Sequence, residues 1–279
     1  MQLKPQNLLK NIIYKMERYK DKALEFVDKT NKTFLGSFYD KNYSSKEKNH
    51  GDFVTEIDLK IERSFRDFIK VNYPTHSIVG EEEIFEDKKS DWLWAIDPID
   101  GTTNYMNGTP ECAIVIGLRY RDIPVLGVCS FPAMNQLYLS ESGKGSCLNG
   151  NKISSQREEN LNRVLLSATY LNGPERMMAM VGDVWDSVAG IRMEMCSLAE
   201  ACNVASGKVG VSILYGLGPH EWPVAYLIAK EAGCSIVSLE NPNIPLDLKG
   251  IKNRNLIIAG NERLLEQVKE FVQLPPSLK

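Results

Sequence analysis

Acidic side chains gather in three short patches of this 279-residue chain, at 51–58, 80–83 and 97–104. In the third patch an apolar run, Trp92–Ile96, ends on Asp97. Pro98 then imposes an extended turn, and a second carboxylate, Asp100, follows directly. Two carboxylates this close at the mouth of a strand repel each other severely unless a cation lies between them. Because hard oxygen ligands suit Mg²⁺, this patch predicts a magnesium site.

The next residues, Gly101-Thr102-Thr103, are typical of the start of a helix. Free backbone N–H groups and two hydroxyls at such a point form a ready site for a phosphate group. Each feature alone has an ordinary explanation, since Asp-Pro is a common turn, Thr55 and Asp58 fit a helix capping box, and acidic runs are often solvated. Together, in this order, they predict metal ligands and a phosphate site in one loop.

The bulk composition is that of an ordinary globular protein, with 43% hydrophobic and 25% charged residues. A net charge of −3 offers nothing special to nucleic acid or to an anionic membrane, so we expect neither as a partner. The six cysteines are scattered without metal-ligand spacing, which indicates reduced thiols. The N-terminus lacks a secretory apolar segment and no run approaches the length of a membrane span, so we expect a cytoplasmic protein.

The elements that must position these patches follow from the spacing of apolar residues. A long amphipathic helix is predicted over 7–27, followed by a polar, lysine-rich loop over 28–51. We interpret that loop as a solvated surface segment, with a lid near the site as the alternative. Further helices are predicted at 58–71, 197–206, 223–232 and 262–272, and strands at 75–79, 92–96, 163–168, 209–214 and 256–259, with a strand meander over 113–140. Alternating strands and helices indicate α/β layers.

The run DPIDGTTNY, preceded by GEE and by DFVTEID, resembles the inositol monophosphatase superfamily of Mg²⁺-dependent, often lithium-sensitive phosphatases. That superfamily includes fructose-1,6-bisphosphatases, histidinol phosphatases and bisphosphate nucleotidases. The match continues through Ser142–Gly145, Leu148–Gly150 and Glu231–Gly233, so it covers nearly the whole chain. DPIDGTT is a highly specific signal, whereas GEE alone would be weak.

The resemblance implies a five-layer α-β-α-β-α sandwich that works as a homodimer on a small-molecule phosphate ester with two or three Mg²⁺ ions. We expect the first half, 1–150, to supply most of the metal ligands, and the second half, 151–279, to complete the metal site and the substrate pocket.

The resemblance also assigns roles by position. The metal ligands would be Glu81, Asp97, the Ile99 carbonyl and Asp100, with Glu82 helping to bind a third ion. Asp58 and Thr102 would orient the attacking water, and Asp52 and Thr55 would support the site or the third metal. The phosphate would contact Asp100, Gly101, Thr102 and Thr103. This arrangement suits phosphate ester hydrolysis, because metals activate water and neutralise phosphoryl charge while a carboxylate and a hydroxyl handle the proton.

The last metal ligand has two candidates. Asp186 lies in Trp185–Gly190, which matches the family's WDxAAG pattern by letter but is far from Glu231–Gly233. Ungapped alignment from Glu231–Gly233 instead places Glu221 at the ligand position. Fructose-1,6-bisphosphatases use a glutamate there, and the Pro-x-Ala-Tyr that follows it in them is echoed by Pro223–Tyr226. We therefore predict Glu221.

The substrate side departs further from the family. Cys196 and Ser197 fall in the family's Gly-Ser/Thr-Ala segment, and His220 replaces a tryptophan. We interpret His220 as packed beside the site, with a substrate contact or a proton-donating role as the alternative. Leu214 replaces the glutamate that holds the ring hydroxyls in inositol monophosphatases, so we expect weak hydrolysis of inositol 1-phosphate.

The predicted function is Mg²⁺-dependent hydrolysis of a small phosphate monoester, whether of a sugar, polyol, nucleotide or amino alcohol. A fructose-1,6-bisphosphatase-like enzyme is one alternative. The other is a non-catalytic regulator of the same fold that binds a metal or a phosphometabolite. A protein that only binds would not need the Asp58–Thr102 pair, because that pair acts on water rather than on the ligand; its presence favours an enzyme.

Overall fold

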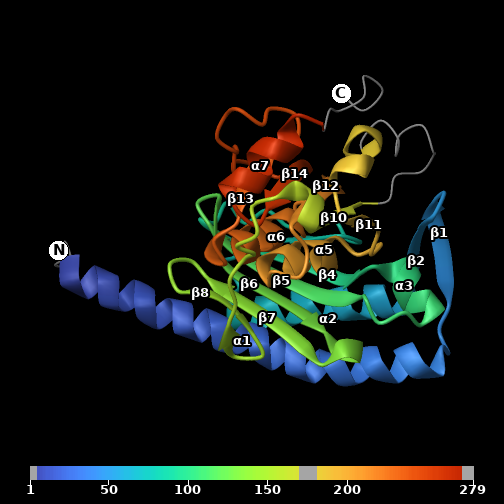
Figure 1. Ribbon diagram of the computed structural model, residues 1–279. Helices are drawn as coiled ribbons and strands as arrows, with labels where there is room; N and C mark the ends of the chain where they lie inside the picture. Colours follow the sequence, from blue (N-terminus) through green and yellow to red (C-terminus); the bar gives the residue numbers. More distant parts are fainter. Residues whose placement is uncertain (1–4, 170–180, 272–279) are drawn as a thin grey trace.

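The computed structural model describes residues 5–169 and 181–271 and is built around two β-sheets (Figure 1). The helices of this part of the chain are α1 (Pro5–Asp40), α2 (Glu56–Asn72), α3 (Thr102–Asn107), α5 (Ser197–Ala205), α6 (Trp222–Glu231) and α7 (Glu262–Lys269). Short 3-10 helices are η1 (Pro132–Met134), η2 (Leu161–Arg163) and η3 (Gly182–Ser187).

The larger sheet has seven strands in chain order, and all of its neighbouring strands are antiparallel except the first pair. They are β3 (Ser77–Gly80), β4 (Trp92–Asp100), β5 (Ala113–Tyr120), β6 (Ile123–Phe131), β7 (Gln136–Glu141), β8 (Gly145–Leu148) and β9 (Asn151–Lys152). A separate antiparallel hairpin consists of β1 (Ser45–Asn49) and β2 (Asp52–Thr55).

The smaller sheet has five strands and a mixed order. Its strands run β11 (Gly190–Arg192), β10 (Leu165–Ala168), β12 (Val211–Leu217), β14 (Arg254–Ala259) and β13 (Ser235–Ser238). Strand β10 pairs in parallel with both of its neighbours, whereas β14 pairs antiparallel with β12 and β13. The sequence pattern did not predict β11 or β13, which are short strands at the two edges of this sheet.

The layers follow the order α-β-α-β-α. Helices α1 and α2 cover one face of the seven-stranded sheet, α5 and α6 lie between the sheets, and α7 covers the outer face of the five-stranded sheet (Figure 1). Three clusters of buried apolar residues fill the interfaces between these layers, and the middle cluster contacts both sheets through α5 and α6. The predicted five-layer sandwich is therefore confirmed, while the division into halves at residue 150 stays a prediction.

Helix α6 lies close to the seven-stranded sheet because two glycines face it. A Cβ on Gly117 would lie 2.9 Å from Cγ2 of Val224, and a Cβ on Gly127 would lie 3.3 Å from Cγ1 of the same residue. Glycine inside a strand marks such close approaches. The consequence for function is that the N-terminus of α6, where Glu221 lies, is held against the sheet that carries Asp97 and Asp100.

The loop predicted over 28–51 is largely wrong, because α1 continues to Asp40. Val27, Thr30, Phe34 and Phe38 recur at helical spacing and are buried, so they continue the apolar stripe of the first helix. The lysines between them face outward, and their polarity hid this periodicity. Only the last part of the segment, residues 41–51, departs from the helix, and its middle forms β1.

Within the described residues, none of the helices has both the length and the apolar character that a membrane crossing requires.

Candidate metal centre

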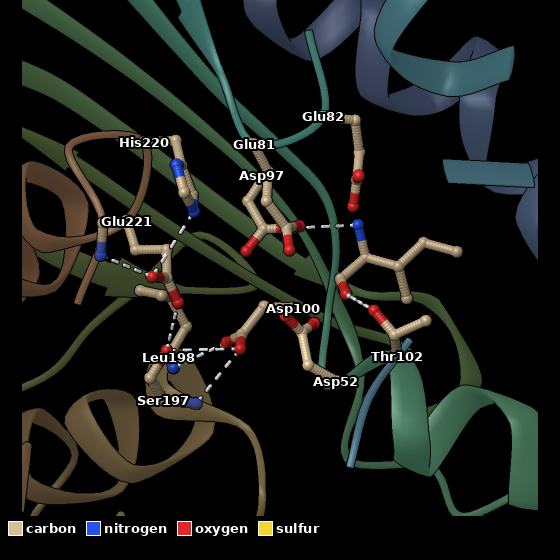
Figure 2. Close-up of polar contacts among 12 residues, drawn as sticks. Asp52, Glu81, Glu82, Asp97, Asp100, Thr102, Ser197, Leu198, His220 and Glu221 are labelled. Carbon is tan, nitrogen blue, oxygen red and sulfur yellow. Dashed lines mark hydrogen bonds and ion pairs between the residues drawn. The ribbon is translucent and has the colours of Figure 1, made fainter. Parts of the chain in front are cut away.

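The end of β4 carries the central carboxylates. Asp97 and Asp100 are both buried, and the pairing of β4 with β5 shifts register between them. Asp97 Oδ1 accepts a hydrogen bond from the Ile99 N–H at 3.0 Å, and the Ile99 carbonyl accepts one from Thr102 Oγ1 at 2.9 Å. The irregular turn thus brings the carboxylates of Asp97 and Asp100 to the same site (Figure 2).

Helix α3 starts directly after this turn, as predicted. Gly101 has a φ of 81°, and a Cβ there would lie 2.9 Å from the Glu111 carbonyl oxygen. Only glycine fits this left-handed position at low cost. Gly101, Thr102 and Thr103 all line the same cavity, which has a volume of about 380 Å³.

Asp100 is held by the N-terminus of α5, a segment almost a hundred residues away in the sequence (Figure 2). Its Oδ1 accepts from Ser197 N at 3.1 Å and from Ser197 Oγ at 3.2 Å, and its Oδ2 accepts from Leu198 N at 2.7 Å. The Cys196 thiol donates to Oδ2 at 3.0 Å. The positive end of a helix stabilises a carboxylate in this position.

Glu221 joins the centre from the turn before α6. Its Oε1 accepts from Ser197 Oγ at 2.6 Å, and its Oε2 accepts from Gly218 N at 2.7 Å. Ser197 therefore contacts both Asp100 and Glu221. Asp186, in contrast, is exposed in η3 and lines a different cavity. Of the two candidates, the structure brings Glu221 to the cluster and leaves Asp186 outside it.

His220 lies beside Glu221, on the side of Glu81 and Asp97 (Figure 2). Its Nε2 is 3.5 Å from Glu221 Oε2, and its side chain lines the cavity. Burial opposes protonation of His220, but the carboxylates of Glu221 and Glu81 outweigh burial and raise the pKa of this imidazole. The ring also packs on Gly218, where a Cβ would lie 2.2 Å from the imidazole. Whether His220 also contacts the substrate stays a prediction.

Three overlapping groups of side chains have ligand atoms within 4.8 Å of one another: Glu81, Asp97 and His220; Asp58, Glu81 and Glu82; and Asp97, Asp100 and Glu221. Burial, and then the neighbouring carboxylates, raise the pKa of Asp97 well above its usual range. Burial and the Glu221 carboxylate raise the pKa of Asp100 to about 7. Crowded carboxylates of this kind require positive charge, and the carboxylate oxygens that predominate in these groups fit Mg²⁺.

Asp58 lies at the start of α2. Its Oδ2 accepts from Thr55 N at 2.9 Å and from Thr55 Oγ1 at 2.5 Å, and the Thr55 hydroxyl oxygen in turn caps the helix. The capping box is therefore real, and it fixes Asp58 beside the metal ligands. Asp58 Oδ1 is 3.5 Å from Thr102 Oγ1, so the structure brings the predicted Asp58–Thr102 pair together. Burial raises the pKa of Asp58 to about 7.

A buried ion pair on α2 holds the loop that carries Glu81 and Glu82. The carboxylate of Glu62 accepts from Arg66 Nη2 at 2.7 Å, from Glu82 N at 2.8 Å and from Glu83 N at 3.1 Å. Glu62 is fully buried and lies against Gly80, where a Cβ would be 2.0 Å from Glu62 Oε1. Close packing against Glu62 therefore requires a glycine at position 80, the first residue of the GEE run.

We expect Gly80→Ala to lower the free energy of unfolding by about 1–3 kcal/mol, as overpacking of a filled interior typically does. The added methyl would displace Glu62 and release the backbone of Glu82, so the variant should also need more Mg²⁺. Urea unfolding monitored by circular dichroism measures the loss. The control is Gly36→Ala in α1, where a Cβ would meet nothing within 4 Å and should leave stability unchanged or slightly raised. Equal stability of the two variants would contradict this packing argument.

Lys48, on the β1–β2 hairpin, contributes a positive charge to the acidic cluster. Its Nζ lies 2.8 Å from Glu81 Oε1, 2.8 Å from Glu82 Oε1 and 3.3 Å from Asp52 Oδ1. Burial opposes the charge, but the glutamates raise the pKa of Lys48 well above its usual value. The lysine therefore lies where the resemblance places the third ion.

We expect Lys48→Met to lower the free energy of unfolding by about 1–2 kcal/mol in the absence of Mg²⁺, because three carboxylates lose a shared, partly exposed cation. Saturating Mg²⁺ should close most of the gap between variant and parent, since an ion can take over the neutralisation. Thermal unfolding with and without Mg²⁺ measures both effects. Lys46→Met, on the exposed part of the same strand, is the control. A loss that Mg²⁺ does not reduce would argue against this role.

The sequence profile of the Inositol monophosphatase family matches residues 15–273. The chain belongs to the inositol monophosphatase family. Human inositol monophosphatase 1 is 31% identical to it over 240 residues, which cover 81% of this chain and 83% of the human protein. Nus factor SuhB of Escherichia coli is 30% identical over 252 residues, covering 83% and 88% of the two chains.

A solved inositol monophosphatase (IMPase) of Thermotoga maritima superposes with a TM-score of 0.78 at 25% identity. The superposition covers 90% of this chain and 95% of the Thermotoga chain. The layered fold described above is therefore that of the inositol monophosphatase family.

One predicted site residue of this family member does not fit its role. Leu214 has no exposed surface, belongs to the core between the two sheets and is not among the described residues that line the cavity. Its neighbour Tyr215 lines the cavity instead. Side chains of a strand alternate between faces, and the β12–β14 pairing is irregular after Leu214, so alignment by letter could not predict which residue faces the site.

Several residues of the site were missed from the sequence: Lys48, Glu62, Thr169, Glu200 and Tyr215. Lys48 and Glu62 act on ligands more than fifteen residues away in the chain, and neither is part of a motif. Glu200 could have been suspected, because a lone glutamate among small apolar residues of a predicted helix is unusual. The tip of the hairpin, His50–Phe53, also lines the cavity, while a lid role for the 28–51 segment stays a prediction.

Proposed function

We propose that this chain is a Mg²⁺-dependent phosphatase that hydrolyses a small phosphate monoester. The proposal rests on two features that occur in the same cavity, a set of metal-binding carboxylates and a pair of groups that can orient water. The overlapping carboxylate groups suit metal ions, and the buried Asp58 lies beside them within 3.5 Å of the Thr102 hydroxyl. Family membership supports the same reaction.

In this proposal Glu81, Asp97, the Ile99 carbonyl, Asp100 and Glu221 hold the ions, and Glu82 supports them. Mg²⁺ bound there supplies Lewis-acid activation of water and neutralises the charge of the phosphoryl group. The protein orients these oxygen ligands in advance through Ser197, Leu198 and the Glu62 network. Such pre-organisation matters because misplaced ligands reduce catalysis steeply.

Asp58 and Thr102 orient the attacking water in this proposal. The Thr102 hydroxyl donates to the Ile99 carbonyl, which leaves its oxygen lone pairs available as acceptors. Asp58 Oδ2 is occupied by Thr55, so Oδ1 is the oxygen that can accept a proton from water. The hydroxyls of Thr102 and Thr103, which line the cavity beside Gly101, are available to the phosphate oxygens.

Metal removal gives the direct test. With a panel of phosphate monoesters, we expect phosphate release with Mg²⁺, inhibition by Ca²⁺, and loss of at least about a thousandfold in rate after EDTA treatment, which corresponds to about 4 kcal/mol of transition-state stabilisation. Restoring Mg²⁺ should restore the rate, which controls for unfolding by the chelator. Equal turnover in metal-free buffer would refute the proposal.

The competing proposal is a binding protein without useful turnover. It is favoured by relatives such as the Escherichia coli protein, which is named a Nus factor. Isothermal calorimetry with the same phosphate esters separates the two proposals. Heat of binding that requires Mg²⁺, with no phosphate release from any ester, would support the regulator and exclude the phosphatase.

A further inference from the structure

One carboxylic acid in the cavity has no part in the metal centre. Glu200, in the first turn of α5, is only 1% exposed yet lines the cavity. Its Oε1 accepts from the Glu194 N–H at 3.2 Å, and its Oε2 accepts from the Thr169 hydroxyl at 3.5 Å. A carboxylate oxygen can accept two hydrogen bonds, so each oxygen has capacity for another donor.

Neighbouring elements fix the position of this group. The Tyr215 N–H donates to Thr169 Oγ1 at 3.2 Å, and the Thr169 hydroxyl donates in turn to Glu200. Thr169 and Tyr215 themselves line the cavity. Glu200 is therefore held in place by the ends of β10 and β12, and a ligand would meet an oriented carboxyl group rather than a mobile side chain.

The charges around the cavity favour a cation at Glu200. Among the described residues that line it, six are acidic and none is lysine or arginine. Four of the six are metal ligands in the proposed function, and Asp52 pairs with Lys48 at 3.3 Å. Glu200 alone has no cation assigned to it. Burial raises the pKa of Glu200 to about 8, as expected for a carboxyl group whose surroundings provide too little positive charge.

We infer that Glu200 selects a phosphate monoester whose alcohol carries a protonated amine, with the phosphate at the metal centre and the ammonium donating to Glu200. This inference rests on the proposed phosphatase function. A charge-assisted hydrogen bond is about twice as strong as a neutral one, so an ammonium is preferred to a hydroxyl. A substrate with a second phosphate or a carboxylate would place like charge against Glu200 without a basic residue to compensate.

The test uses the full-length protein with Mg²⁺ and three matched series of simple esters: ω-aminoalkyl, n-alkyl and ω-carboxyalkyl phosphates of graded chain length. At the chain length that fits best, kcat/KM for the aminoalkyl ester should exceed that for the alkyl ester by about tenfold or more, as a charge-assisted hydrogen bond predicts. The carboxyalkyl ester should be slower than the alkyl ester. In Glu200→Gln the preference for the amine should fall to near unity.

Glu141→Gln is the matched control, because Glu141 is a buried glutamate that pairs with Lys20 and Lys144 and does not line this cavity. It should keep the parental preference. Equal rates for amino and alkyl esters at every length would overturn the inference while leaving the phosphatase proposal intact. If folded Glu200→Gln still preferred the aminoalkyl ester, the inference would also be overturned. If no ester of any series released phosphate, the proposed function would fail and this inference with it. Thermal unfolding reports on folding, and the parental series decides the question if Glu200→Gln does not fold.

Discussion

Asp100→Asn should lose at least about a thousandfold in kcat/KM, or about 4 kcal/mol of transition-state stabilisation. Four donors, from Cys196, Ser197 and Leu198, converge on the Asp100 carboxylate. An asparagine would turn an NH₂ group toward some of these donors and would offer a neutral oxygen to the metal. The site would lose both charge and orientation.

The fold should survive this substitution. Asp100 lies among carboxylates that repel it, so removing its charge relieves repulsion in the absence of metal. We expect a thermal midpoint without Mg²⁺ that is no lower than that of the parent. Asp91→Asn is the control, because Asp91 precedes the same strand but is exposed and pairs with Arg121. Full activity in Asp100→Asn, or an equal loss in Asp91→Asn, would contradict the assignment.

Glu221→Gln should raise the Mg²⁺ concentration needed for half-maximal activity by about tenfold or more, since it replaces a charged ligand by a neutral amide. The amide would also face two donors, Ser197 Oγ and Gly218 N, with only one acceptor oxygen. Activity at saturating Mg²⁺ should recover in part. The Mg²⁺ requirement is measured by following phosphate release at increasing Mg²⁺ concentration. Calorimetric titration with Mg²⁺ measures the affinity for the ion in the absence of turnover.

Asp186→Asn distinguishes the two alignments. Asp186 is exposed on η3, so the substitution should leave the Mg²⁺ requirement unchanged. Glu221→Asp is a second informative variant, because it keeps the charge and shortens the side chain by one methylene. We expect its Mg²⁺ requirement to lie between those of the parent and of Glu221→Gln. If Asp186→Asn raised the Mg²⁺ requirement and Glu221→Gln left it unchanged, the last metal ligand would have been assigned to the wrong segment.

The local parts of the site could be predicted from the sequence. Asp97, Ile99, Asp100 and Thr102 lie within six consecutive residues, so a strand end, a proline turn and a helix start suffice to bring them together. The same holds for Thr55 and Asp58, which form one capping box. Interactions of this kind depend on backbone conformation over one or two turns, which residue types largely determine.

Prediction from the sequence failed in two places. One was a helix that continues through polar residues, and the other was a strand in which the side chain that faces the cavity was misassigned. The helix through Asp40 was missed because polar residues and Gly36 separate Val27, Thr30, Phe34 and Phe38. Leu214 was assigned to the substrate, although it packs in the core and Tyr215 faces the cavity. A shift of one residue along a strand reverses the side of every side chain, and an alignment by letter does not record it.

The sequence by itself determined the layered α/β class, the acidic motifs and the metal chemistry that they suit, because these depend on residue type and on spacing over a few residues. Only the tertiary structure decided how distant groups meet at the site. It brought Glu221 and the α5 N-terminus to Asp100, Lys48 to Glu81, and Glu200 to the cavity wall. The physical reason is that these contacts arise from tertiary packing, such as that of α5 and α6 between two sheets. Close packing, set by small residues such as Gly117 and Gly127, determines such distances, and no local pattern encodes them.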